Sequence, residues 1–212
     1  WKIQPDSVLS VHGIVNAIAL AIQAYTQPGD GIILFSPVYH AFSRVINASG
    51  RNLVESPLVK DSIGKYKMDM EATANLLNGN EKMLILCSPH NPGGRVWSVK
   101  ELEQVAEFAE RYNLLVVSDE IHHDLVYDGH IHTPFEKAVS SARPYLLTLT
   151  STTKTFNIAG MHTGNVIISD EKLRDKFKKT LQALAISPSS FGVAMTTAAY
   201  NGGEEWLNEL LI

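Results

Sequence analysis

The chain has 212 residues, of which 45% are hydrophobic and 19% are charged, so it can bury a sizeable core in one large domain or in one and a half small ones. Its formal net charge of -4 gives no general attraction to nucleic acid or to an anionic membrane, and no apolar stretch approaches the length of a membrane span. The single cysteine, Cys87, excludes an internal disulfide and fits a reducing, cytoplasmic setting.

The first pattern along the chain is an amphipathic helix. Apolar residues from 14 to 25 recur at the spacing of one helix face, and Gly13 stands where that helix begins. Free amides and the helix dipole at such an N-terminus can bind a phosphate, whereas a glycine there can equally serve only as a helix cap. A short apolar strand at 32–35 follows and leads to Tyr39, whose ring could stack on a planar ligand or simply pack with its hydroxyl satisfied.

Strands and helices then alternate. Further strands are predicted at 52–55, 82–87, 114–117 and 145–149, and further helices at 69–77 and 99–112. Apolar strands separated by helices are typical of a largely parallel sheet with helices on both faces and right-handed crossovers. The sequence therefore predicts an α/β fold.

Polar side chains follow the ends of several predicted strands. Tyr39, Asn91, Asp119 and Lys154 each come just after such an end, and Asn91 belongs to the turn-rich stretch 88–95. In parallel sheets ligands gather outside the carboxyl ends of the strands. We therefore expect these four side chains to converge on one site.

Lys154 is the centre of that prediction, because it is the one lysine among the hydroxyl residues of 150–155. It is either a solvated loop residue or a desolvated nucleophile able to form a Schiff base with a pyridoxal cofactor. The second hypothesis needs a cradle for a phosphate and a carboxylate facing the ring nitrogen. Asp119 follows an apolar strand and must be paired there, either with such a nitrogen or as a helix N-cap.

Three other sets of side chains have simpler interpretations. The histidines at 122, 123, 130 and 132 match no usual metal-ligand spacing, so we predict no metal site. Cys87 ends an apolar run and is expected to be a packed strand residue rather than a nucleophile. The basic residues Lys176, Lys178 and Lys179 are expected to form a solvated helix face.

Five of these motifs, in this order and spacing, resemble the fold-type I pyridoxal-phosphate enzymes, the class I/II aminotransferase superfamily. They are Gly13 at a helix start, Tyr39 after Ser-Pro, Asn91-Pro92-Gly93, Asp119-Glu120-Ile121-His122, and the stretch 151–160. The resemblance covers essentially the whole chain. Segments 89–97 and 118–122 are most similar to the carbon-sulfur β-lyase branch of the cystathionine β-lyase type. Ordinary transaminases more often have Thr after Asn-Pro, and Tyr at the position of His122.

The resemblance implies pyridoxal 5'-phosphate as the cofactor. It implies that Lys154 bonds covalently to the cofactor and that Asp119 keeps its ring nitrogen protonated. The other implied cofactor contacts are Tyr39, Asn91 and His122 at the ring, and the amides of Gly13 and Ile14 with the hydroxyls of Ser151 and Thr153 at the phosphate. His162 stands where many relatives carry a phosphate-binding arginine, so this residue departs from the common pattern.

The resemblance also implies an organisation and an activity. Residues 1–212 would form the large cofactor-binding domain of the aspartate-aminotransferase-like fold, without the N-terminal arm and C-terminal small domain, and the protein would be a homodimer. The reaction would be a β-elimination that converts cystathionine or a cysteine-like amino acid to a thiol, pyruvate and ammonia. Two alternatives stay open, a class I/II aminotransferase and a non-catalytic cofactor-binding domain of a transcription regulator. A plain nucleotide-binding domain is discounted, because no Gly-x-Gly-x-x-Gly follows a strand.

Overall fold

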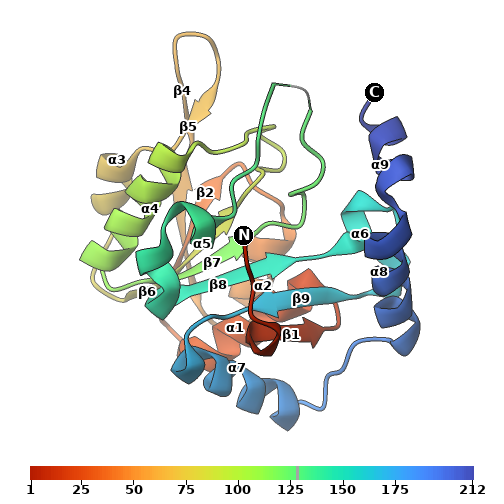
Figure 1. Ribbon diagram of the computed structural model, residues 1–212. Helices are drawn as coiled ribbons and strands as arrows, with labels where there is room; N and C mark the ends of the chain where they lie inside the picture. The colour runs from red at the N-terminus through yellow and green to blue at the C-terminus, as the bar shows by residue number, and fades with distance from the viewer. Residues whose placement is uncertain (128) are drawn as a thin grey trace.

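A seven-stranded sheet with helices on both faces organises the part of the chain that the structure describes, residues 1–127 and 129–212 (Figure 1). The structure is a computed structural model. The spatial order of the strands is β1-β9-β8-β7-β6-β2-β3. Their bounds are β1 (Val8–Val11), β2 (Gly31–Ser36), β3 (Asn52–Pro57), β6 (Glu81–Cys87), β7 (Leu115–Asp119), β8 (Leu146–Thr150) and β9 (Gly164–Ile167). The predicted α/β class is confirmed.

Most of this sheet is parallel, as predicted. Strands β3, β2, β6, β7 and β8 run parallel to one another, whereas β9 is antiparallel to both β8 and β1. The pairing of β1 with β9 joins residues that are distant in the chain, since Val11 lies opposite Gly164. A separate two-stranded hairpin, β4 (Val59–Lys60) with β5 (Tyr66–Lys67), projects from the end of the molecule beside α3 (Figure 1).

The helices confirm two predictions and shorten a third. The bounds are α1 (Ile14–Tyr25), α2 (Ala41–Ala48), α3 (Met70–Ala74), α4 (Val99–Arg111), α5 (Phe135–Ala138), α6 (Thr152–Thr155), α7 (Glu171–Ala183), α8 (Ser190–Gly202) and α9 (Glu204–Leu210), with 3-10 turns η1 (Pro5–Ser7), η2 (Ser140–Tyr145) and η3 (Ala159–Met161). The helix predicted at 69–77 is only α3, which Asp69 caps by accepting a hydrogen bond from the Ala72 amide. A capping box between Ser98 and Glu101 begins α4.

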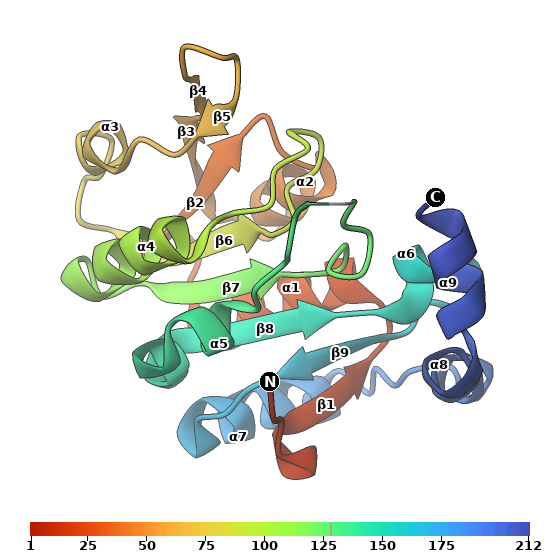
Figure 2. The same cartoon turned by 45° about the horizontal axis from the view of Figure 1, so that its top comes forward.

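The strands divide their side chains between two cores. Ile32 and Leu34 of β2 pack on the face covered by α1, α2 and α7, while Ile33 and Phe35 pack on the face covered by α4 and α5 (Figure 2). Because both faces are covered, the strands are continuously apolar rather than alternating. Truncating one of these side chains to alanine costs about 2–5 kcal/mol.

Two surface features complete the description. Lys176, Lys178 and Lys179 are exposed on α7, as expected for a solvated face. None of the helices in the described residues has the length and apolarity needed to cross a membrane.

Candidate active site

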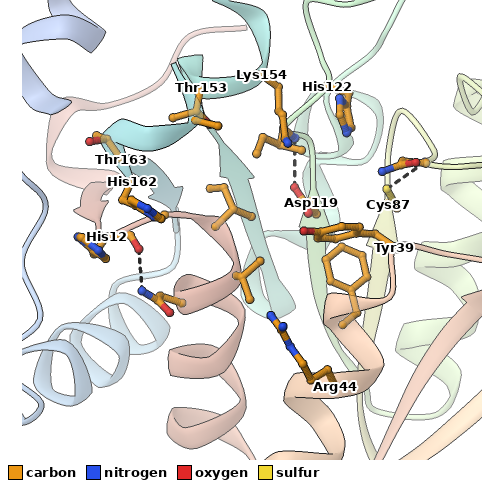
Figure 3. A pocket seen from close by; sticks show the side chains of 18 residues that line it. His12, Tyr39, Arg44, Cys87, Asp119, His122, Thr153, Lys154, His162 and Thr163 are labelled. Atoms are coloured by element: carbon orange, nitrogen blue, oxygen red, sulfur yellow. Dashed lines mark hydrogen bonds between the residues drawn. The ribbon is translucent and has the colours of Figure 1, made fainter. Parts of the chain in front are cut away.

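A cavity of about 440 Å³, here called the first cavity, opens at the carboxyl ends of β6, β7 and β8 and beside the N-terminus of α1 (Figure 3). It is lined by the predicted residues Gly13, Ile14, Tyr39, Asn91, Asp119, His122, Thr153, Lys154 and His162. Ser151 is the one predicted site residue that does not line it. The expected convergence of strand ends is therefore present.

Asp119 is the last residue of β7 and is only 4% exposed. Burial, with a smaller contribution from the charge of Glu120, raises the pKa of this carboxyl group to about 7. A hydrogen bond from the Ile121 amide (3.1 Å) and the charge of Lys154 act in the opposite direction on this pKa. A buried carboxylate in this position is stabilised by a ligand that presents a positively charged N–H group.

Lys154 lies on the short helix α6, which follows β8 directly. Its side chain is exposed to solvent in this structure, so Lys154 is not the desolvated lysine that the second sequence hypothesis describes. The ion pairs among the described residues do not include one between Lys154 and Asp119. The Lys154 charge nevertheless acts across the cavity, since it lowers the pKa of both Asp119 and His122. Lys154 therefore faces a buried acid across the cavity and forms no ion pair with another described residue.

The hydroxyl groups of Ser151 and Thr153 have different roles. Ser151 is 1% exposed; its hydroxyl donates to the Thr163 carbonyl (2.6 Å) and accepts from the Thr153 amide (3.1 Å). The Ser151 hydroxyl has one proton, and it donates this proton to the Thr163 carbonyl. In the 2.7 Å contact between the Ser151 and Thr153 hydroxyls, Thr153 is therefore the donor. In this structure Ser151 supports α6 from below and Thr153 faces the cavity. The contact of Ser151 with a phosphate stays a prediction.

The opposite end of the first cavity is suited to an anion. Gly13 is the N-cap of α1 with φ of 83°, a left-handed conformation that favours glycine. The Gly13 amide donates to the Val11 carbonyl (3.0 Å), so the amides left for a ligand are those of the first turn, beginning with Ile14. No acidic residue lies in that turn. The helix dipole therefore acts there without an opposing charge.

Three side chains form the remaining wall. Tyr39 packs edge-on against Phe42 with ring centroids 5.7 Å apart and is 36% exposed. The main-chain N–H of Asn91 donates to Sγ of Cys87 over 3.3 Å, and this hydrogen bond fixes the turn after β6. Burial, followed by the charge of Lys154, lowers the pKa of His122. A planar ring would thus have an aromatic neighbour and polar side chains at its rim.

Cys87 is buried in the floor of the first cavity, as its position at the end of an apolar run predicts. Burial, with a smaller contribution from the charge of Asp119, raises the pKa of its thiol to about 12. The thiol is therefore protonated at neutral pH and is not a nucleophile.

The sequence did not identify two charged or titratable residues of this site, His12 and Arg44. Both line the first cavity, and Figure 3 shows Arg44 reaching toward it from α2. His12 directly precedes Gly13, and its ring stacks on that of His162, with centroids 5.2 Å apart and planes at 7°. The sequence offered one signal for His12, which is its position just before a glycine-capped helix. For Arg44 it offered no signal beyond the helical spacing from Ala41.

A second cavity of about 340 Å³ adjoins the first one. Asn91 and His122 line both cavities, so they stand at the boundary between them. The second cavity also contains Lys65, Leu125 and Tyr127. Among the residues that the structure describes, no group of three or more His, Cys, Asp and Glu side chains is placed to hold a metal ion.

Comparisons with known proteins agree with this geometry. The model of the family Aminotransferase class I and II matches residues 1–211. Cystathionine beta-lyase PatB of Bacillus subtilis is 38% identical over 213 residues, which cover 100% of this chain and 55% of that protein.

Two solved structures have the same fold. Cystalysin from Treponema denticola, whose crystal structure contains a pyridoxal 5'-phosphate cofactor, gives a TM-score of 0.94 at 34% identity over 99% of this chain and 53% of its own. N-Succinyldiaminopimelate aminotransferase from Mycobacterium tuberculosis gives 0.88 at 31% identity over 99% and 54%. The chain spans about half the length of these relatives. On the match of nearly every residue to the family model, this chain belongs to the class I and II aminotransferase family.

Proposed function

We propose that this chain is the cofactor-binding part of a pyridoxal-phosphate-dependent carbon-sulfur β-lyase acting on cystathionine or cysteine-like amino acids. The observation that carries the proposal is the placement of Lys154 and Asp119. Lys154 follows β8, and Asp119 is the last residue of the adjacent strand β7. Both face one cavity, whose far end is the acid-free N-terminus of α1. An amine, a buried acid and an anion site in one cavity match the three reactive parts of this cofactor.

The donor set fits pyridoxal phosphate. The Asp119 carboxylate, with its single hydrogen bond from Ile121, would pair with a protonated ring nitrogen. The ring of Tyr39 would cover one face, and the Ile14 amide with the Thr153 hydroxyl would bind the phosphate. The Lys154 amine is free to attach the aldehyde.

The bound cofactor supplies an aldehyde that condenses with amines and a ring that accepts the electron pair left at the substrate Cα. Lys154 Nζ would accept the proton from Cα, and ionised Asp119 would keep the ring nitrogen protonated. His122 and Asn91 would orient the ring from its rim. The sulfur then leaves Cβ with the bonding electron pair and takes a proton. Overall, one substrate and one water give a thiol, pyruvate and ammonium.

The lyase is preferred because PatB is a cystathionine beta-lyase and matches this chain from end to end. The second cavity supports this choice, since it provides room beyond Asn91 and His122 for a large substituent on the substrate Cβ. A short side chain would leave that space unused.

A class I/II aminotransferase is the second candidate, and the 31% identity to N-succinyldiaminopimelate aminotransferase supports it. The first proton transfer by Lys154 is common to both reactions. The two reactions differ in their later steps, because transamination returns the proton to the cofactor side and needs a 2-oxo acid to complete a cycle.

The deciding experiment supplies the full-length protein with pyridoxal phosphate, records its visible spectrum and adds L-cystathionine alone. The lyase predicts a lysine-dependent absorption band and steady release of thiol and pyruvate, both lost in Lys154→Ala. Turnover only after addition of a 2-oxo acid would identify the aminotransferase. A bound cofactor without turnover under either condition would favour the regulator domain.

We propose in addition that the protein is a cytoplasmic homodimer acting on a small amino acid, as the family resemblance implies. Light scattering of the full-length protein would measure the assembly, and a monomeric mass would contradict this part of the proposal.

A further inference from the structure

The stacked rings of His12 and His162 form a boundary between the first cavity and a third one of about 460 Å³. His12 precedes the N-cap of α1, and His162 follows η3, so the two rings come from segments far apart in sequence. Figure 3 shows them side by side at the end of the first cavity away from Asp119. The pair therefore flanks the same amides of α1 that suit an anion.

His162 is held in an uncommon backbone conformation. Its φ of 46° lies in the left-handed region, which few residues other than glycine adopt. Its main chain packs beside Gly13, where an added Cβ would lie 3.9 Å from the His162 carbonyl carbon. Backbone strain of this kind concentrates at functional sites.

Among the described residues that line the two cavities, no acid stands beside the pair. The other charged or titratable residues lining the first cavity are Tyr39, Arg44, Cys87, Asp119, His122 and Lys154. The third cavity is otherwise lined by Gly160, Met161, Ser189, Phe191 and Met195, none of which titrates. Within the described residues, Asp119 is thus the one carboxylate lining either cavity, and it lies across the first one.

We propose that His12 and His162 act as a proton-coupled anion contact, taking up a proton when a phosphate dianion binds at the N-terminus of α1. Two stacked imidazoles repel each other when both are protonated, and a neighbouring dianion removes this repulsion. The identity of the natural anion as the cofactor phosphate rests on the proposed function. Anion binding itself is measurable without any turnover.

Sulfate is the probe, because it stays a dianion across the pH range in which imidazoles titrate. Calorimetry of sulfate binding to the cofactor-free full-length protein, in two buffers of different ionisation enthalpy, counts the protons taken up. If one proton is taken up for each sulfate bound, the affinity for sulfate should rise by up to about tenfold for each unit that the pH falls from 8 to 6. Circular dichroism establishes that each sample is folded.

Two variants and one control locate the effect. His12→Asn and His162→Asn should each lower the proton uptake and flatten the pH dependence, and asparagine tolerates the left-handed backbone at position 162. His40→Asn, a substitution of an exposed histidine that lines none of these three cavities, should keep both. If proton uptake persists in both site variants, or if sulfate does not bind, the proposal is wrong.

The outcome is separable from that of the proposed function. Thiol release with no proton uptake on sulfate binding would reject only the histidine pair. Proton-coupled sulfate binding with no turnover on any amino acid would reject only the lyase.

Discussion

Oε2 of Glu120 lies 2.9 Å from Nε2 of His132, and the two side chains are 1% and 6% exposed. The same carboxylate accepts hydrogen bonds from the Ser118 hydroxyl and the Phe135 amide, each over 2.9 Å. Glu120 thereby joins the end of β7 to the start of α5. The residue after Asp119 is thus fixed on both sides, which holds the buried acid of the site in place.

Replacing Glu120 by alanine should lower the free energy of unfolding by about 3–5 kcal/mol, because three buried donors lose their acceptor. Urea denaturation measures this change. Glu103→Ala, on the exposed side of α4, is the matched control and should change stability by less than about 0.5 kcal/mol. Equal, small losses in both variants would contradict the role given to Glu120.

Asp119→Asn should stabilise the cofactor-free protein at alkaline but not at acidic pH. The folded-state pKa of about 7 exceeds the value of about 3.9 in an unfolded chain, so the folded state holds a proton that the unfolded state has lost between these values. Wild-type stability therefore falls as pH rises through this window, and the asparagine variant does not share this fall. The advantage of the variant should reach the order of 4 kcal/mol at pH 8.

Denaturation of both proteins at pH 5 and pH 8 checks this prediction. Asp175→Asn, at an exposed position of α7, controls for the loss of one negative charge. If the gain in the free energy of unfolding of Asp119→Asn over the wild type does not grow from pH 5 to pH 8, the Asp119 carboxyl group is ionised over this whole range.

Cys87 should resist alkylation in the folded protein. Its pKa is raised to about 12 by burial, and Sγ is engaged with the Asn91 amide and the Pro89 carbonyl, each over 3.3 Å. Iodoacetamide at pH 8 should leave the native protein unmodified while it consumes free glutathione, and denaturant should release one thiol per chain. Rapid labelling of native protein, measured by mass spectrometry, would contradict this picture.

Two glycines of α8 should respond oppositely to alanine. A Cβ at Gly192 would lie 1.7 Å from Oγ1 of Thr163 and 2.7 Å from the Met161 carbonyl oxygen, whereas nothing lies within 4 Å of a Cβ at Gly202. Gly192→Ala should therefore cost about 1–3 kcal/mol through overpacking. Gly202→Ala should be neutral or stabilising by up to about 1 kcal/mol, because alanine is the better helix former.

Thermal unfolding compares the two glycine variants directly. Equal behaviour would show that α8 does not depend on its close approach to the backbone at 161–163.

The sequence predicted the central strands because their residues are apolar on both faces, as in 32–35 and 82–87. It did not predict β1 or β9. Both are short, and they contain serine, glycine or asparagine, since β1 forms an edge of the sheet and β9 lies next to it. Their pairing partners are distant in the chain, so no local pattern marks them.

The same distinction applies to the site. Asp119, Asn91 and Lys154 could be predicted because each follows a strand end, where topology alone determines the location. His12 could not be assigned a role, because its stacking on His162 depends on a long-range contact. The motif located Ser151 near the site, but the direction of its hydroxyl depends on how α6 is capped.

The pairing of β1 with β9 also determines when the first cavity can form while the chain folds during its synthesis. Val11 and Gly164 are about 150 residues apart, yet their pairing brings together the neighbouring residues His12 and Thr163, which line the first cavity. During synthesis on the ribosome, the helix that begins at Ile14 must wait until β9 has emerged before this part of the cavity can form. Contacts of such sequence separation form late and slowly, so a nascent chain that stops before β9 should be unable to capture any ligand in this cavity.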